Sequence, residues 1–192
     1  MHGRGTSERD LAGLLDVLDP RRRLVGACPR GPLALPPGGF HWYAVPRVGF
    51  PDPDSFHATF ARLDAWLAAL AEEAGVPPGR TVLGGFSQGA VMAWALGAGQ
   101  GRPRPAGILS MSGFIPTVPG FEVEAATLAG LPVAITHGGL DPIIPVDFGH
   151  DARGRATQAG ADVLYRESPI AHTLDPKALP ELAEWVQAAT SP

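Results

Sequence analysis

The sequence contains a single cysteine, Cys28, and this scarcity excludes several kinds of protein. One cysteine can form neither a disulfide within the chain nor a thiolate metal cluster. Residues 24–27 before it are apolar or small, and a proline follows it. We therefore expect Cys28 to act as a small apolar side chain at the end of a buried strand.

Long apolar runs and excess positive charge are also lacking. No stretch reaches the roughly 18 apolar residues of a membrane span, and the opening Met-His-Gly-Arg-Gly does not resemble a secretory signal. The net charge of −4 gives no basic footprint for nucleic acid or for an anionic membrane. These absences predict a cytoplasmic protein that binds no nucleic acid and does not insert stably into a membrane.

The length and the apolar content indicate how the chain is organised. With 192 residues, of which 45% are hydrophobic, it fits one globular domain over residues 1–192 with a sizeable core. Short apolar runs alternate with helical patterns along its whole length. The predicted strands cover residues 24–28, 81–86, 106–111, 133–136 and 162–166, and the predicted helices cover 11–18, 53–74, the segment after 87, 147–158 and the segment from 176.

The runs predicted to be strands are continuously apolar, and the connections between them are too long for hairpins. Both features are typical of a parallel sheet covered by helices on both faces. Local signals set some helix ends: Ser7 and Asp10 have capping-box spacing before the first helix. Asp52 is expected to cap the second helix, with Pro53 in its first position and Gly75 at its end.

The segment Gly85-Phe86-Ser87-Gln88-Gly89 has the spacing of a nucleophile elbow, G-x-S-x-G, placed between a predicted strand and a predicted helix. A strand that turns into a helix within one residue leaves the serine strained and projecting, and side chains at 85 and 89 would collide across the turn. The pattern alone is weak evidence in a glycine-rich chain, and an ordinary strand-to-helix turn is the alternative.

Two further residues complete a possible nucleophile site. A serine hydroxyl needs a base to remove its proton, and the base needs an acid that orients it. Asp141 follows a predicted strand inside a glycine turn, although a plain turn residue would look the same. Of the six histidines, only His172 follows the acid in the order serine, acid, histidine and also lies in a loop after a strand. His137 is expected to pack or to hydrogen-bond its turn.

Backbone amides near the serine are candidates for binding an oxyanion. The amide of Gln88 begins the helix after Ser87 and points toward the group that the serine attacks. The segment His2-Gly3-Arg4-Gly5 has the small-residue form expected of a second donor loop, and the amide of Arg4 is the candidate there. The alternative is an N-terminus that is simply flexible.

Together these motifs resemble the phospholipase/carboxylesterase family, which includes the acyl-protein thioesterases. The likeness rests on the elbow, His2-Gly3-Arg4-Gly5, Pro29-Arg30-Gly31-Pro32, Gly38-Gly39-Phe40-His41-Trp42, Ser112-Gly113-Phe114-Ile115-Pro116, His137-Gly138-Gly139-Leu140-Asp141 and the late His172. It implies an α/β-hydrolase fold, a triad of Ser87, Asp141 and His172, no metal or organic cofactor, and hydrolysis of small-molecule esters or thioesters.

The sequence departs from the family pattern at its start. Family members carry an apolar strand directly before the His-Gly motif, whereas here Met1 takes that position. The missing strand belongs in the middle of the sheet, between residues 24–28 and 81–86, so its loss is expected to leave a gap with unpaired backbone groups on both sides. A natural start upstream of Met1 and a rearranged sheet are both compatible with this pattern.

We expect a serine esterase that acts on small or medium acyl esters through an acyl-serine intermediate. Thioesterase or lysophospholipase action is the enzymatic alternative, and a long apolar channel near Trp42 and Phe114 would favour it. These two aromatic side chains are the expected substrate contacts. A non-catalytic binding protein with a hydrolase fold is the other alternative, and the sequence leaves a homodimer open.

Overall fold

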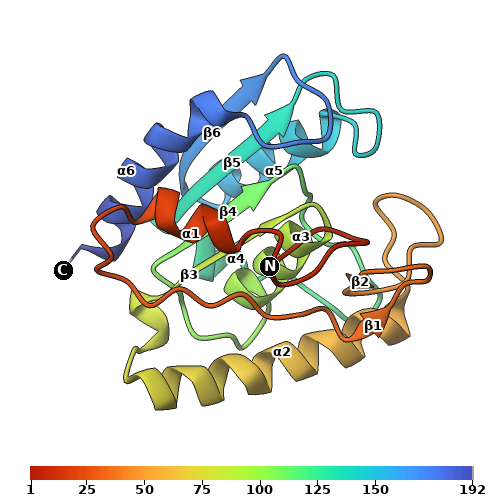
Figure 1. Ribbon diagram of the computed structural model, residues 1–192, viewed down its shortest axis with the longest axis horizontal. Helices are drawn as coiled ribbons and strands as arrows, with labels where there is room; N and C mark the ends of the chain where they lie inside the picture. The colour runs from red at the N-terminus through yellow and green to blue at the C-terminus, as the bar shows by residue number, and fades with distance from the viewer. Residues whose placement is uncertain (192) are drawn as a thin grey trace.

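Four parallel strands form the central sheet of the computed structural model, which describes residues 1–191 (Figure 1). They lie side by side in their order along the chain, and each pairs in parallel with the next. The strands are β3 (Val82–Phe86), β4 (Gly107–Met111), β5 (Pro132–Gly138) and β6 (Asp162–Ser168). The predicted parallel sheet is therefore confirmed, and the order brings the carboxyl ends of all four strands to one edge.

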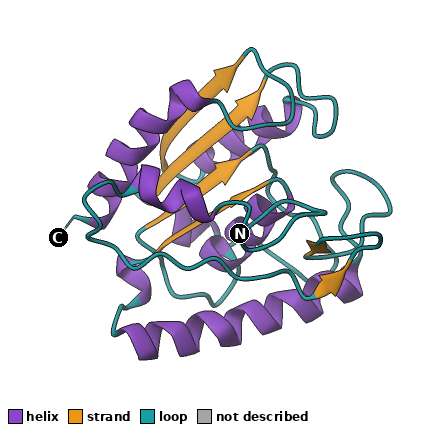
Figure 2. Cartoon of the chain, in the orientation of Figure 1, coloured by secondary structure: helices purple, strands orange, loops and turns teal. Residues whose placement is uncertain are grey.

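Helices cover both faces of this sheet, as the unbroken apolar runs predicted (Figure 2). Ile108 packs on one face with α3 (Gln88–Ala98), α5 (Asp147–Gln158) and α2 (Pro53–Ala74). Leu109, the next residue of β4, packs on the opposite face with α1 (Ala12–Leu18) and α6 (Leu179–Thr190). Consecutive strand residues are thus buried on opposite sides, which explains why the sequence shows no alternation of polar and apolar residues.

The second helix, α2, has the ends that its sequence predicts. The Asp52 side chain accepts a hydrogen bond from the amide of Ser55 at 3.0 Å, and Pro53 occupies the first turn. Gly75 ends the helix in the left-handed conformation, with φ of 64°. A residue with a side chain would be strained there, so glycine is the natural stop.

Several short elements lie where the sequence predicted only loops. Strands β1 (Leu33–Ala34) and β2 (Phe40–His41) form a small antiparallel pair, and Thr6 bridges to Phe40 beside them. A four-residue helix, α4 (Ala125–Leu128), interrupts the loop after β4. The two 3₁₀ turns, η1 (Pro78–Arg80) and η2 (Pro176–Ala178), precede β3 and α6. Elements this short carry too few residues to show a period.

Two local predictions were wrong. Residues 24–28 form no strand: Leu24 and Val25 are exposed, and the segment runs extended along the surface. A strand needs a neighbour to satisfy its backbone groups, and no strand lies beside this segment. The capping box at Ser7 is also absent, because α1 begins after Leu11 with no side-chain cap.

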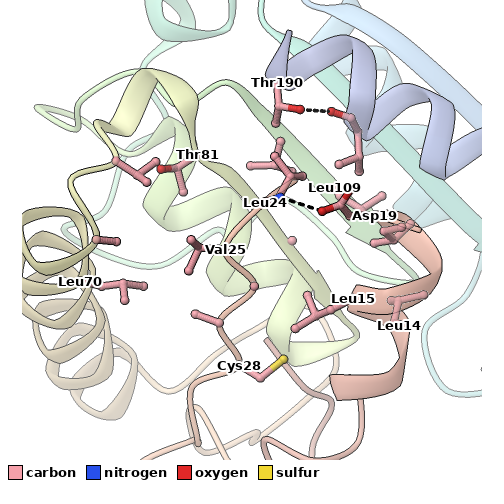
Figure 3. A pocket seen from close by; sticks show the side chains of 18 of the residues that line it. Leu14, Leu15, Asp19, Leu24, Val25, Cys28, Leu70, Thr81, Leu109 and Thr190 are labelled. Carbon is pink, nitrogen blue, oxygen red and sulfur yellow. Dashed lines mark hydrogen bonds between the residues drawn. The ribbon is translucent and has the colours of Figure 1, made fainter. Parts of the chain in front are cut away.

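The expected gap beside the sheet is present. A cavity of about 690 Å³ lies between residues 24–28 and β3, and Met1 is among the residues that line it (Figure 3). The strand that carries Ser87 is therefore an edge strand of the four-stranded sheet. Among residues 1–191, no helix combines the length and apolar character that a bilayer crossing requires.

Candidate active site

Ser87 stands at a sharp turn between the end of β3 and the start of α3. Its backbone has φ of 54° and ψ of −121°, a conformation that residues other than glycine rarely adopt. A side chain on Gly85 would collide with the backbone of Gly89 across the turn. The amide of Ser87 donates to the carbonyl of Met111 at 2.9 Å, which fixes the turn to β4. This geometry matches the predicted elbow.

His172 lies between Ser87 and Asp141. Its Nε2 is 3.0 Å from Ser87 Oγ, and its Nδ1 is 2.6 Å from Asp141 Oδ2. An ionised carboxylate can only accept, so Nδ1 carries the proton and Nε2 is left as the acceptor for the serine hydroxyl. The structure therefore joins three residues that are far apart in sequence into one chain of hydrogen bonds.

Asp141 uses its two carboxylate oxygens for different purposes. Oδ1 accepts from the amides of Ile143 and Ile144 at 2.8 and 2.9 Å, while Oδ2 faces His172. The side chain is fully buried, so the carboxylate is held by its hydrogen bonds and not by water. Asp141 therefore does both things that the sequence left open: it stabilises its own turn, and it hydrogen-bonds His172.

The segments that hold the two candidate oxyanion donors meet at the elbow. A Cβ placed on Gly3 would be 3.6 Å from Ser87 Cβ, so the segment before Arg4 runs directly beside the serine. Within residues 1–191, the amides of Arg4 and Gln88 have no acceptor among backbone or side-chain groups. Gln88 is buried, whereas Arg4 is exposed, so a missing partner is unusual only for the amide of Gln88. Unpaired amides beside a serine hydroxyl are suited to bind an anion.

His2 anchors the segment that carries Arg4. The amide of Gly31 donates to His2 Nε2 at 2.9 Å, so the other ring nitrogen carries the proton and donates to the carbonyl of Gly3 at 2.7 Å. Burial lowers the pKa of His2, which favours this neutral ring. Trp42 Nε1 adds a bond to the carbonyl of His2 at 2.7 Å. The N-terminal segment is thus tied down by several hydrogen bonds.

Comparison with known proteins places this geometry in a family. The phospholipase/carboxylesterase family matches residues 1–190. The chain belongs to the phospholipase/carboxylesterase family. Among its relatives are acyl-protein thioesterase 1 of Saccharomyces cerevisiae, 28% identical over 61% of this chain and 53% of the relative, and acyl-protein thioesterase 1 of Debaryomyces hansenii, 25% identical over 76% and 65%. The chain spans about half to two thirds of the length of these curated relatives.

Solved structures show the same fold. A carboxylesterase from Mesorhizobium loti aligns with a TM-score of 0.83 and 22% identity, over 97% of this chain and 85% of that one. The chain therefore has the α/β-hydrolase fold of its family, with the sheet and its two helix layers as described above.

His137 supports the loop of Asp141 in this family member, as the sequence led us to expect. Its Nε2 donates to the carbonyl of Ile144 at 2.9 Å and lies 3.7 Å from Asp141 Oδ2. A side chain on Gly149 of α5 would collide with the imidazole ring, with its Cβ 2.8 Å from Nδ1. The histidine thus fills the space that the glycine leaves and holds both ends of the turn.

A clasp of two side chains that sequence reasoning missed holds the loop of His172. Ser168 Oγ donates to Asp175 Oδ2 at 2.6 Å, which closes the ends of the loop against each other. The Ser168 hydroxyl, and after it the amide of Lys177, lower the pKa of the Asp175 carboxyl. The sequence signal that could have predicted this bond is the presence of Ser168 and Asp175 on either side of His172.

Gln88 also contributes a side chain, which the sequence analysis did not foresee. Its Oε1 accepts from the amide of Trp42 at 3.0 Å, and its Nε2 donates to the carbonyl of Tyr43 at 2.9 Å. The glutamine therefore satisfies two buried backbone groups of the loop that faces the elbow.

The two expected substrate contacts are both buried. Trp42 has no exposed surface because its indole points inward to bond His2, so it offers a substrate nothing to touch in this conformation. Phe114 is 5% exposed and packs against Phe148, with ring centroids 5.2 Å apart. Among residues 1–191, no group of three or more His, Cys, Asp and Glu side chains is placed to hold a metal ion.

Proposed function

We propose that this protein is a serine carboxylesterase that hydrolyses small or medium acyl esters through an acyl-serine intermediate. The observation that carries the proposal is the hydrogen-bonded chain from Ser87 through His172 to Asp141. Membership of the phospholipase/carboxylesterase family supports it.

The first half of the proposed reaction forms the acyl-enzyme. His172 Nε2 accepts the proton of Ser87 as Oγ attacks the ester carbonyl carbon. The carbonyl oxygen becomes an oxyanion, to which the amides of Gln88 and Arg4 donate. The intermediate then collapses, the ester C–O bond breaks, and His172 gives its proton to the departing alkoxide, which leaves as an alcohol.

The second half releases the acid. A water molecule gives a proton to His172 Nε2 and attacks the acyl carbon, and the same two amides bind the second oxyanion. The bond to Ser87 Oγ breaks, the serine recovers its proton from the imidazolium, and a carboxylic acid departs. Throughout, Asp141 holds the ring in the tautomer with the proton on Nδ1 and stabilises its charged form.

Cleavage of thioesters is the second candidate, and the names of the curated relatives favour it. The same groups would serve, because only the leaving atom changes from oxygen to sulfur. A long acyl chain would need an apolar channel near Trp42 and Phe114. Since both side chains are buried, the structure lends more support to short acyl groups.

A fluorophosphonate probe tests the proposal, since it reacts only with an activated serine. We expect the 192-residue chain to be labelled at Ser87 and the Ser87→Ala variant to remain unlabelled. Ser112→Ala is a suitable control, because Ser112 is a buried serine and, among residues 1–191, the hydroxyl that His172 hydrogen-bonds is that of Ser87. Full activity in Ser87→Ala would overturn the mechanism.

The substrate class is then settled by comparing p-nitrophenyl esters from acetate to palmitate with matching acyl thioesters. We expect kcat/KM to be highest for the short esters. A preference for long thioesters would refute the proposed substrate class and leave the serine mechanism standing. No turnover of any substrate, together with no labelling, would favour a non-catalytic binding protein.

A further inference from the structure

Phe86, the residue before Ser87, contacts the base of the proposed triad. The centroids of its ring and of the His172 imidazole are 4.8 Å apart, and the two ring planes meet at 42°. Rings at this separation are in favourable contact. The elbow pattern does not account for this contact, because G-x-S-x-G accepts any residue at the position of Phe86.

The two hydrogen bonds of His172 leave one motion of its ring unrestrained. Nε2 lies 3.0 Å from Ser87 Oγ, and Nδ1 lies 2.6 Å from Asp141 Oδ2, so both bonds hold the ring by its edge. The ring can still tilt about the line that joins its two nitrogen atoms. Phe86 contacts the body of the ring and therefore restrains this tilt.

The ring of Phe86 is itself held in place by the core. It packs with Met111 on the side of the sheet that α1 and α6 cover. Leu174, two residues after His172, packs against the same apolar cluster, so Phe86 and the loop of the base share one support. A Cβ placed on Gly3 would lie 3.1 Å from Phe86 Cδ1, which shows how closely the N-terminal segment approaches the ring. Phe86 thus has little room to move away from the imidazole.

Phe86 also lies against the group on which charge develops. His172 becomes an imidazolium when it takes the proton of Ser87. An aromatic ring attracts a nearby cation through its quadrupole. A leucine side chain would fill much of the same space, but it has neither the flat surface nor this attraction.

Few titratable groups lie near the imidazole. They come from β5, β6 and the segments that follow these strands: His137, Asp141, Glu167 and Asp175. Among residues 1–191, Asp141 is the one carboxylate within 4.0 Å of the His172 nitrogens. Glu167 and Asp175 are each hydrogen-bonded to another side chain. The groups in direct contact with the imidazole are therefore Ser87, Asp141 and Phe86.

We propose that Phe86 is a positioning residue for His172. Its ring supports the imidazole between the two hydrogen bonds, keeps Nε2 directed at Ser87 Oγ and favours the imidazolium that forms when the serine attacks. The inference rests on the proposed function, because it gives Phe86 a role in the same reaction. It adds a requirement that the elbow pattern does not contain: in this chain the residue before the serine must be aromatic.

Three substitutions of Phe86 and one control test this role. Phe86→Leu and Phe86→Met remove the aromatic ring and keep a large apolar side chain in the core. Phe86→Tyr keeps the ring. The matched control is Phe60→Leu on α2, because Phe60 is half-buried like Phe86 and its ring packs with Phe56 and Phe121.

Steady-state kinetics give the first readout. In the leucine and methionine variants we expect kcat to fall about ten- to a hundredfold, with KM changed by less than about threefold. The acidic limb of the pH profile of kcat/KM should move to lower pH by roughly half a unit, because the imidazolium is less favoured without the ring. Phe86→Tyr should stay within about threefold of wild type. Phe60→Leu should lower the stability and leave both kcat and the pH profile unchanged.

The second readout needs no turnover. The proton between His172 Nδ1 and Asp141 Oδ2 lies in a 2.6 Å hydrogen bond, and its NMR signal should appear far downfield. A ring that tilts weakens this bond, so the signal should broaden in Phe86→Leu and Phe86→Met and stay sharp in Phe86→Tyr and Phe60→Leu. If the unaltered chain neither hydrolyses esters nor reacts with a fluorophosphonate, the proposed function fails, and the NMR comparison still decides whether Phe86 supports the ring.

Four outcomes would overturn the proposal. Wild-type kcat together with a sharp downfield signal in Phe86→Leu and Phe86→Met would show that Phe86 serves the core alone. An equal loss of kcat in Phe60→Leu would trace the effect to stability. A kcat in Phe86→Tyr as low as that in Phe86→Leu would show that an aromatic ring is not what the base requires. Failure of both ring-free variants to fold, while Phe60→Leu folds, would assign Phe86 to the fold and not to the positioning of His172.

Discussion

Asp141 and His172 are joined by a short hydrogen bond, 2.6 Å between Oδ2 and Nδ1, while the other oxygen of the same carboxylate holds its own turn. The turn bonds from Ile143 and Ile144 leave Oδ2 in a fixed position. The imidazole is therefore oriented by a carboxylate that cannot itself rotate. Because one oxygen holds the turn and the other orients His172, a mutation can remove the second role and keep the first.

Replacing Asp141 with asparagine should abolish most of the activity and leave the fold intact. Asparagine retains one oxygen for the two turn amides, but its NH₂ group would face His172 and force the wrong tautomer. By analogy with serine hydrolases in general, we expect kcat to fall by about four orders of magnitude. Ester hydrolysis and urea unfolding measure the two effects. Leu140→Ala, an exposed neighbour, is the control, and activity within tenfold of wild type would contradict the prediction.

Removing the clasp at the ends of the His172 loop should misplace the base. In Ser168→Ala, Asp175 loses its 2.6 Å bond, and we expect kcat to fall by about ten- to a hundredfold with little change in KM. Ser168→Thr retains the hydroxyl and should restore most of the loss. Steady-state kinetics distinguish the two, and equal kcat values for the alanine and threonine variants would show that the bond does not position the histidine.

Truncation of the Gln88 side chain should destabilise the protein. Gln88→Ala leaves the amide of Trp42 and the carbonyl of Tyr43 without their partners, and each unsatisfied buried group costs about 1–3 kcal/mol. The free energy of unfolding in urea should therefore fall by roughly 2–6 kcal/mol. Gln100→Ala, at an exposed glutamine, should change it by less than about 0.5 kcal/mol. Equal stabilities of the two variants would contradict the bonding seen here.

Stability should rise with pH between about 6 and 8 because of the buried amino terminus. Burial lowers the pKa of the Met1 amino group from 8.0 to about 6, with the neighbouring Cys28 as a smaller opposing influence. In this window the unfolded chain binds the extra proton and the folded chain does not, so the stability increases with pH, by roughly 3 kcal/mol in total. The lowered pKa of His2 acts in the same direction.

An acetylated amino terminus isolates the contribution of Met1 to this pH dependence. Urea unfolding of the two forms at pH 5.5, 6.5, 7.5 and 8.5 should show a smaller rise in the acetylated chain, since of the two groups only His2 can then titrate. Parallel curves would mean that the amino group is not desolvated in the folded protein.

From the sequence one could predict that Ser87, Asp141 and His172 lie close together, and the structure brings these three side chains into hydrogen-bonding distance. Ser87, Asp141 and His172 each follow a strand, and the order of parallel strands brings strand ends together whatever the details of packing. The sharp turn from strand to helix requires glycines at 85 and 89, so the sequence also predicted the elbow. For these residues, the local sequence is enough to predict that they meet at the same edge of the sheet.

Features that depend on distant partners escaped sequence reasoning. Residues 24–28 have the composition of a strand but lack a neighbour to pair with, and a run of five residues cannot reveal that. Trp42 looked like a substrate contact until the structure showed its bond to His2, 40 residues away. The carboxamide of Gln88 hydrogen-bonds a loop 45 residues upstream, and no local sequence pattern predicts such a contact.

The position of β3 at the edge of the sheet has a consequence for solubility. An exposed edge strand can pair with the edge of another molecule and seed aggregation. Here the segment of residues 24–28 and the helices α1 and α2 line the cavity beside this edge and so obstruct the approach of a neighbouring chain. These segments therefore shield the edge, and loosening residues 24–28 would uncover a surface prone to self-association at the strand that precedes Ser87.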